Sequence, residues 1–371
     1  MILYKFYRPG ENFNKAIRYS EIYFSSNKQL NDPNDLKAKY YFEDDKELWS
    51  KLLRTEVPIG VKDLAQLLKL DDGILSSGLN DLFKGIKVDA NAKSLNKIFE
   101  DKKNVTLKLI GKSLRNIDEL SDMWYSGLDE PVPFLVENCH AAIKELVFKG
   151  IKTEVYSVSF SKTPLEPMMW AHYADGFKGC AIVYQLPDDN LYLTKNIYSD
   201  QMFKISMHEV KYHDGEKLIP ILQCGLGEQA PIEQALLNKN SFWKYESEMR
   251  AFMFRSQRMM LATLSDKYVI PEFEERIFHT HPALIAGVLF GPAFDESKKY
   301  LVEFTLRNTK EAKKCKANFF LFDTQLNDNG TIKITQAKEC KPSTDPKDYM
   351  SELYQERKLQ ILLDRMGVVQ K

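Results

Sequence analysis

The chain has 371 residues, of which 44% are hydrophobic and 12% aromatic, and its 52 lysines and arginines balance 52 aspartates and glutamates. This length and apolar content predict a globular protein with one large domain or two of ordinary size, and they exclude a disordered chain. The formal net charge of zero argues against a general nucleic-acid coat and against a polybasic membrane binder.

Three absences in the sequence bear on its compartment. No apolar run approaches the roughly 20 residues that span a bilayer, and the N-terminus lacks the pattern of a signal peptide. The five cysteines are scattered and form no Cys-x-x-Cys pair, so we expect neither a disulfide framework nor a zinc knuckle. A reduced, cytoplasmic protein without membrane association is the prediction.

Residues 1–43 are predicted to begin the sheet of an α+β core. Within them, residues 3–8 and 21–26 are rich in aromatic and β-branched residues, which favour strands, and the polar segment 11–19 is predicted to be helical. Residues 44–149 then carry apolar residues at helical spacing, so we expect a mainly helical insertion there.

Strands are predicted to return in residues 150–340. Residues 153–161 alternate apolar side chains with serines, which predicts a strand with one serine face. A helix is expected to follow, with Thr163 as its N-cap, Pro164 as its first residue and Glu166 completing a capping box.

The rest of the chain completes the predicted fold. Strands are expected at residues 179–186, 267–273 and 284–290, and the pair Asn329-Gly330 indicates a hairpin. Residues 341–371 are predicted to form an amphipathic C-terminal helix. The whole pattern predicts an α+β fold whose mixed or antiparallel sheet is built from both ends of the chain around the helical insertion.

The segment around Glu246 and Glu248 is the most informative for chemistry. If residues 242–255 form one strand, Glu246, Glu248 and Arg250 share a face. Alternate residues of a strand lie roughly 6.5–7 Å apart, so buried carboxylates there would repel and the pKa of one would rise, while Arg250 would offset the repulsion. A solvated strand face with a Glu–Arg pair is the alternative interpretation.

The serine face is a second candidate for the same site. Ser157, Ser159 and Ser161 need polar partners if they are buried, although a half-exposed edge strand would also explain them. No Gly-x-Ser-x-Gly elbow surrounds any of the three, which argues against a nucleophilic serine.

Two further segments could contribute polar groups. Trp170, His172 and Tyr173 lie near the end of the predicted helix, where the helix dipole favours a protonated histidine. Asn31 and Asp32 lie in a turn-forming stretch, residues 31–35, that could present two carboxylates, those of Asp32 and Asp35, to a cation or another ligand. Packing, helix capping and turn formation are the alternative roles of these residues.

Established ligand motifs are missing. No P-loop, dinucleotide-binding GxGxxG, HExxH or EF-hand pattern occurs. His279 and His281 form a His-Thr-His sequence without a visible third ligand, so no metal site is predicted.

Taken in order, these segments resemble a bacterial family known only as a domain of unknown function. Leu30, Asn34 and Ser159 depart from the residues usual in that family. The resemblance implies that polar residues from four separate segments form one site, and it implies no activity. It rests on six motifs: Tyr4–Arg8, Phe24-Ser25 with Asn31-Asp32-Pro33, Ser159-Phe160-Ser161, Met169–Gly176 with Gly179, Trp243-x-Tyr245-Glu246-x-Glu248-x-Arg250, and a late strand ending in Phe290-Gly291-Pro292.

A weaker resemblance, to ADP-ribosyltransferases of the Arg–Ser–Glu type, implies a mechanism with NAD as the substrate. These enzymes carry an arginine on the first strand, Ser-x-Ser on a middle strand and Glu-x-Glu on a later one, and the same order occurs here. The matching residues are Arg8, then Ser157-Val158-Ser159, then Glu246-Ser247-Glu248.

The roles that this resemblance implies are specific. Arg8 would hold the pyrophosphate and a serine would orient the nicotinamide ribose. Glu248 would stabilise an oxocarbenium-like transition state, and Glu246 would position or deprotonate the acceptor. An NAD glycohydrolase would use the same groups. The predicted catalytic residues are Glu248, Glu246 and His172, and the predicted substrate-binding residues are Arg8, Ser157, Ser159, Asn31, Asp32, Trp170, Tyr173, Tyr245 and Arg250.

Two other functions stay open at this point. In a metal-dependent hydrolase or nuclease-like effector, Asp32, Asp35, Glu246 and Glu248 would gather a divalent cation, with His172 as acid or base. In a non-catalytic sensor or interaction module, the helical insertion would dock a protein partner. A small-molecule ligand is expected, nucleic acid is not indicated by the net charge, and a defence or toxin role is as open as a housekeeping one.

Overall fold

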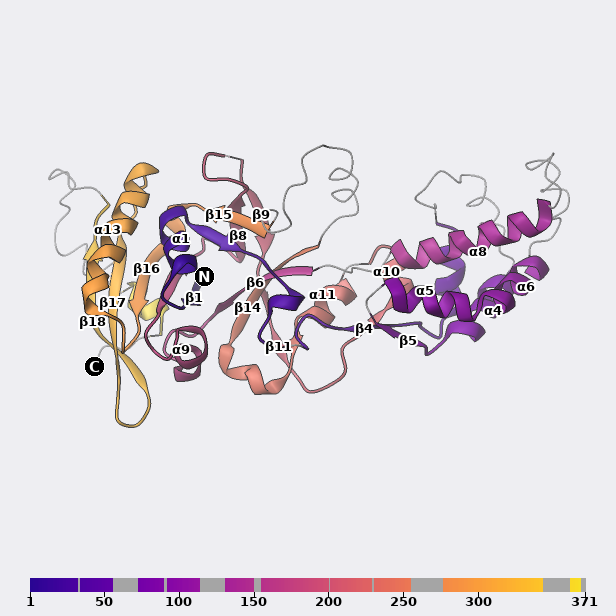
Figure 1. Ribbon diagram of the computed structural model, residues 1–371, viewed down its shortest axis with the longest axis horizontal. Coiled ribbons are helices and arrows are strands. Elements are labelled where there is room, and N and C mark those ends of the chain that lie inside the picture. Colours follow the sequence, from indigo (N-terminus) through magenta and orange to yellow (C-terminus); the bar gives the residue numbers. More distant parts are fainter. Residues whose placement is uncertain are drawn as a thin grey trace. The chain divides into compact units, whose positions relative to one another are not determined.

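A computed structural model of the chain describes residues 1–32, 34–55, 73–89, 92–113, 131–149, 155–199, 201–228, 230–254, 276–342 and 361–367. The chain divides into two compact units, whose elements are labelled in Figure 1. Unit 1 comprises Met1–Leu30, Val155–Asp214 and Lys239–Lys371, and unit 2 comprises Asn31–Glu154 and Gly215–Asn238.

Unit 1 is built on a mixed sheet whose strands come from both ends of the chain. Its strands are β1 (Ile2–Tyr7), β3 (Ser25–Ser26), β6 (Val155–Ser161), β7 (Cys180–Gln185), β10 (His208–Glu209), β14 (Glu248–Phe254), β16 (Ile285–Phe290), β17 (Phe319–Leu326) and β18 (Ile332–Cys340). Their order is β10-β14-β6-β1-β7-β16-β17-β18, with β3 also paired to β6. The β16–β17 pair is parallel, whereas β1, β6, β7 and β14 pair antiparallel. The predicted α+β class and its mixed sheet are confirmed.

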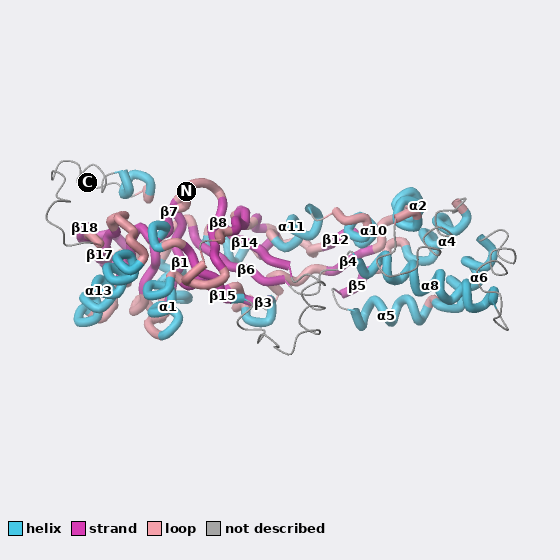
Figure 2. Tube along the Cα trace, turned by 90° about the horizontal axis from the view of Figure 1, so that it is seen from above, coloured by secondary structure: helices cyan, strands magenta, loops and turns pink. Residues whose placement is uncertain are grey.

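Helices cover both faces of this sheet. On one face, α1 (Glu11–Tyr19) and α13 (Glu296–Ala312) lie side by side and bury Phe13 and Leu306 against the strands (Figure 2). On the other face, α9 (Pro167–Tyr173) packs through Trp170, and the short helical stretch 361–365 packs through Leu363. The described end of the chain is thus helical, as predicted, and the remainder of that predicted helix lies outside the described residues, as does the predicted strand 267–273.

A second, smaller sheet completes unit 1. Its strands are β2 (Glu21–Tyr23), β15 (Ile277–Thr280), β8 (Asn190–Thr194) and β9 (Phe203–Ser206), in that order. Phe278 of β15 packs in the same core as Leu191, Leu193 and Ile22, so both sheets share one hydrophobic cluster with α1 and α13. This shared core holds the strands that carry the candidate site.

Unit 2 is mainly helical, as expected of the insertion. Its helices are α2 (Lys46–Leu53), α4 (Ile74–Phe83), α5 (Ala92–Asp101), α6 (Lys103–Ser113), α8 (Pro131–Lys149), α10 (Ile221–Gly225) and α11 (Ala230–Leu236), and a small sheet joins β12 (Leu218–Pro220), β4 (Lys39–Tyr41) and β5 (Lys87–Asp89). The rings of Phe42, Trp49, Phe83 and Phe99 pack with centroids 5.0–6.0 Å apart, so this unit has an aromatic core of its own.

The helix predicted to begin at Pro164 begins later. Pro167 is the first residue of α9, and the Glu166 carboxylate caps it by accepting the N–H of Met168. Thr163 is engaged elsewhere, because its N–H donates to the Ser161 hydroxyl at 3.1 Å. The prediction of a Thr163 cap was therefore wrong, since Glu166 competes for the same role with a proline directly after it.

Two smaller findings complete the description. None of the helices in the described residues is long and apolar enough to cross a bilayer. All five cysteines are buried and unpaired with one another.

Candidate functional site

The two glutamates of the predicted site come from different elements. Glu246 ends the 3₁₀-helix η2 (Ser241–Glu246), and Glu248 begins β14. Between them, Ser247 has a left-handed backbone (φ 44°), which breaks the strand alternation. The prediction of one continuous strand through Glu246 was therefore wrong, although Glu248 and Arg250 do share a strand face.

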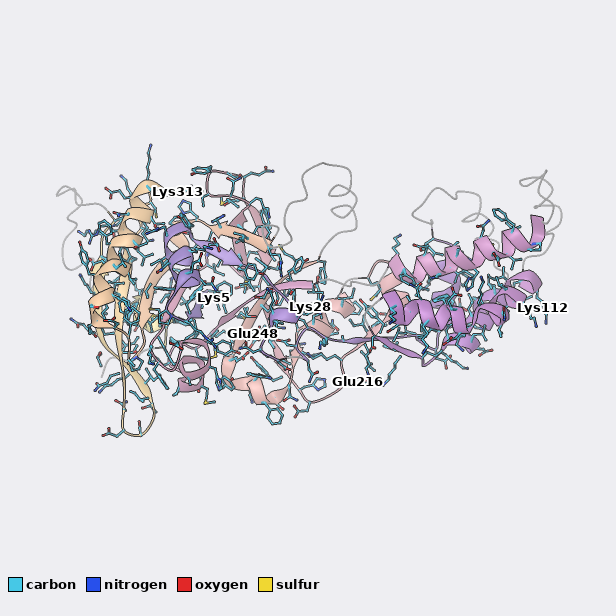
Figure 3. All side chains as sticks on the ribbon, in the orientation of Figure 1. Lys5, Lys28, Lys112, Glu216, Glu248 and Lys313 are labelled. Atoms are coloured by element: carbon cyan, nitrogen blue, oxygen red, sulfur yellow. The ribbon has the colours of Figure 1, made fainter. Side chains whose placement is uncertain are left out.

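The side chains converge even so, because a buried lysine bridges the two carboxylates. Lys239 Nζ lies 2.5 Å from Glu246 Oε2 and 3.1 Å from Glu248 Oε2. The Arg250 guanidinium binds the Glu248 carboxylate in bidentate fashion: Nε donates to Oε1 at 2.6 Å, and Nη2 donates to Oε2 at 2.9 Å. All four residues are 5% exposed or less, and Glu248 is labelled in Figure 3 within the sheet of unit 1. We call these four residues the charge network.

The serine face lies beside the charge network, since β6 pairs with β14. The register sets Ser161 opposite Glu248 and Ser159 opposite Arg250. Ser161 Oγ donates to the backbone carbonyl of Glu246 at 2.7 Å, and a side-chain hydrogen bond joins Ser159 to Glu248. Ser157, opposite Phe252, is buried and its hydroxyl has no hydrogen-bond partner among the described residues. Two of the three serines therefore hold the glutamate segment in place.

Helix α9 supplies the next contacts. The Tyr173 hydroxyl donates to Glu246 Oε1 at 2.5 Å. The His172 ring stacks on the Tyr245 ring with centroids 6.1 Å apart, which places it next to the residue that precedes Glu246. An Arg8 guanidinium nitrogen is 3.5 Å from the His172 carbonyl, at an exposed position just after β1. This contact places a cation at the C-terminal end of α9, where the helix dipole favours one.

Trp170 has a structural role rather than the predicted ligand contact. Its side chain is fully buried, its Nε1 donates to the Pro164 carbonyl at 2.8 Å, and the Phe6 ring packs edge-on against it at 5.1 Å. Asn31 and Asp32 belong to unit 2, where Asp32 Oδ1 accepts the N–H of Asn34 at 2.8 Å and closes a turn.

Sequence reasoning missed two residues of the site. Lys239 lies between two asparagines, and Tyr212 lies in a short polar strand, β11 (Lys211–Tyr212), so neither carries a periodic or motif signal. Yet the Tyr212 hydroxyl accepts the N–H of Glu248 at 2.9 Å. Charge balance could have predicted a residue such as Lys239, because two buried carboxylates need more positive charge than Arg250 alone provides.

The network drives the pKa values of its two carboxylates apart. Burial would raise the pKa of Glu248, but Arg250 and Lys239 outweigh burial and lower that pKa to about 2. Burial raises the pKa of Glu246 above its ordinary value, against the opposing effect of Lys239. Glu248 is thus a fixed anion at neutral pH, while Glu246 is the carboxyl that exchanges a proton more readily.

The described residues contain no group of three or more histidine, cysteine, aspartate or glutamate side chains that could hold a metal ion. The arrangement provides a carboxylate with a lowered pKa, Glu248, and a second carboxyl with a raised pKa that is bonded to Tyr173, Glu246. It also provides the exposed guanidinium of Arg8 at the C-terminal end of α9. These groups suit a reaction in which positive charge develops beside Glu248 and a proton passes to Glu246.

Comparison with known proteins adds one finding. No curated protein and no solved structure matches the chain. The part that matches a family model runs from α9 into β14, and therefore includes Tyr173, Lys239, Glu246, Glu248 and Arg250. In agreement with the predicted resemblance to a domain of unknown function, residues 169–251 match the family described as "Protein of unknown function (DUF2971)".

Proposed function

We propose that the chain is an NAD-using enzyme of the ADP-ribosyltransferase type, with its active centre at Glu246 and Glu248 in unit 1. The observation that carries the proposal is the geometry of two buried carboxylates, Glu248 held by Arg250 and Lys239, and Glu246 bonded to Tyr173. The opposite displacement of their pKa values supports it. Cleavage of a glycosidic bond needs a fixed anion beside the sugar and a second carboxyl that moves a proton. The two glutamates have those two properties.

Each residue then has a defined task. The Glu248 carboxylate, oriented by Arg250 and Ser159, stabilises the positive charge that develops on the ribose as the bond to nicotinamide breaks. Glu246, held by Tyr173, takes the proton that the acceptor loses as its new bond to the ribose forms. Arg8, at the end of β1, is the cation for the pyrophosphate.

Release of nicotinamide from NAD tests this proposal. Purified wild type is incubated with NAD and a range of acceptors, and nicotinamide is measured by liquid chromatography. Glu248→Gln is expected to slow release by roughly 100-fold or more, as removal of one transition-state stabiliser does. Glu296→Gln, on the exposed start of α13, is the matched control and should change nothing.

A second variant guards against misfolding, because Glu248→Gln leaves two buried cations with one carboxylate fewer. Tyr173→Phe removes only the hydroxyl bonded to Glu246 at a half-buried position, and should slow release by roughly tenfold while circular dichroism stays unchanged. If wild type releases no nicotinamide with any acceptor, or Glu248→Gln releases it at the wild-type rate, the proposal is wrong.

A specific observation also favours a non-catalytic module as second candidate. The two acids and two bases of the charge network neutralise one another inside the fold, as buried ion networks with a purely structural role do. In that case wild type and Glu248→Gln would be equally inactive with NAD and would differ only in their free energies of unfolding.

A further inference from the structure

Three neighbouring aromatic rings lie next to residues of the charge network, and we call them the aromatic rim: His172, Trp243 and Tyr245. The Tyr245 ring lies 6.1 Å from the His172 ring with planes 29° apart, and 6.1 Å from the Trp243 ring with planes 43° apart. His172 is exposed, and the other two are half-buried. None of the three belongs to the hydrophobic clusters of unit 1, so core packing does not explain them.

The rim is joined directly to the proposed active centre. Tyr245 precedes Glu246 in the chain, and His172 precedes Tyr173, whose hydroxyl bonds Glu246. Lys239 Nζ also lies 5.1 Å from the centre of the Trp243 ring, a cation–π distance. A planar ring stacked on Tyr245 would therefore lie next to the residue that precedes Glu246, because neighbouring Cα atoms are only about 3.8 Å apart.

Arg8 supplies the charge that such a ligand would need. Its guanidinium makes a long contact, 3.5 Å to the carbonyl of His172, and a guanidinium has five N–H donors in a fork that fits phosphate. The same histidine thus contributes its ring to the rim and its carbonyl to the placement of Arg8. The aromatic rim and Arg8 thus meet at His172, an arrangement that suits a ligand with both a planar ring and a phosphate.

We infer that the aromatic rim binds the planar base of a nucleotide and that Arg8 binds its phosphate. The inference rests on the proposed function, which it deepens by naming the group that holds the base. Stacking on exposed aromatic rings tolerates different bases, because every base has a π-face. AMP is therefore a suitable probe, and it has no nicotinamide bond for the enzyme to break.

Isothermal titration calorimetry with three probes separates base from phosphate. Tyr245→Leu is expected to weaken binding of AMP and adenosine by roughly fivefold or more, and to leave ribose 5-phosphate unchanged. Arg8→Gln is expected to weaken AMP and ribose 5-phosphate and to leave adenosine unchanged. Tyr300→Leu, at an exposed ring of α13 that stacks on Phe304, is the control and should leave all three affinities unchanged. No binding of AMP by wild type, or equal AMP affinity in Tyr245→Leu, overturns the inference.

Failure of this inference can be told apart from failure of the proposed function. If the probes follow the expected pattern while NAD yields no nicotinamide, the base site stands and the transfer reaction does not. If Tyr245→Leu releases nicotinamide with the wild-type KM for NAD, the reaction stands and the base site is wrong.

Discussion

Lys239 is the residue on which both carboxylates of the network depend. It is buried, and its ammonium contacts Glu246 and Glu248 together. Lys239→Met keeps the length of the side chain but leaves three charged groups with a net negative charge inside the fold. Breaking a buried ion pair from one side costs about 3–5 kcal/mol, so we expect a loss of that order in the free energy of unfolding.

Urea denaturation followed by circular dichroism measures this loss. Lys244→Met, at an exposed position of η2, is the matched control and should stay within about 0.5 kcal/mol of wild type. Equal stabilities of the two variants would show that Lys239 is not the counter-charge of the network.

The lowered pKa of Glu248 makes a prediction about acid stability. A carboxyl whose pKa is lower in the folded state stabilises the fold above its unfolded pKa, and the effect is lost as pH falls through the folded pKa. For Glu248 this window runs from the ordinary value of 4.5 down to about 2. Its full contribution is about 3 kcal/mol, since one pKa unit corresponds to about 1.4 kcal/mol.

The measurement is the difference in unfolding free energy between wild type and Glu248→Gln across pH. That difference should be constant above about pH 5 and should shrink as the pH falls toward 2. Glu246 acts with the opposite sign, because its raised pKa favours the fold at low pH and this effect is lost as pH rises through the folded pKa. A difference that does not change between pH 5 and 3 would contradict the assignment of Glu248 as the ionised member.

At the scale of elements, the sequence predicted a strand or helix correctly where one repeating pattern of apolar and polar residues continued through the whole segment. The serine alternation predicted β6, and helical segment 11–19 coincides with α1. The same reasoning failed at Glu246, because Asn240 accepts the N–H of Phe242 and starts a 3₁₀ turn that ends at left-handed Ser247. Alternation alone cannot reveal such a turn, since a Glu-x-Glu sequence looks the same on a strand and across a strand start.

The junction of β1, α9 and β7 depends on a glycine. A Cβ on Gly179 would lie 2.1 Å from the Tyr7 carbonyl oxygen and 2.9 Å from Ala174 Cα, and both are backbone atoms. Gly179→Ala must therefore push apart the strand end that precedes Arg8 and the helix end that precedes β7. We expect a loss of about 3 kcal/mol in the free energy of unfolding.

A second glycine provides a control of opposite sign. Gly111 lies within α6 with nothing within 4 Å of an added Cβ, so Gly111→Ala should raise stability by about 0.5–1 kcal/mol. Thermal unfolding of both variants decides the point. A Gly179→Ala protein as stable as wild type would show that the backbone at Tyr7 and Ala174 can shift at little cost to accept the added Cβ.

At the scale of the whole molecule, the zero net charge has a local counterpart. Glu246, Glu248, Lys239 and Arg250 form a neutral set inside unit 1, so the burial of four charged side chains adds nothing to the overall balance. Composition could exclude a charge-driven binder, but it could not show that opposite charges gather at one place. The clustering of these charges depends on the pairing of β6 with β14, and on the chain re-entering unit 1 at Lys239.

The last prediction concerns the thermal unfolding of the two units. Each unit has its own core, and Phe83 lies at the centre of the aromatic core of unit 2, with its ring 5.0 Å from those of Phe42 and Phe99. Phe83→Ala should cost unit 2 about 3–5 kcal/mol, because it removes a fully buried ring. Since the charge network lies wholly in unit 1, differential scanning calorimetry should then show unit 2 melting first, in a separate transition.

Val105→Ala, at an exposed position of α6, is the control and should leave the calorimetric profile of wild type unchanged. A single transition that shifts as a whole in Phe83→Ala would mean that the two cores unfold together and that the insertion supports the sheet carrying the site.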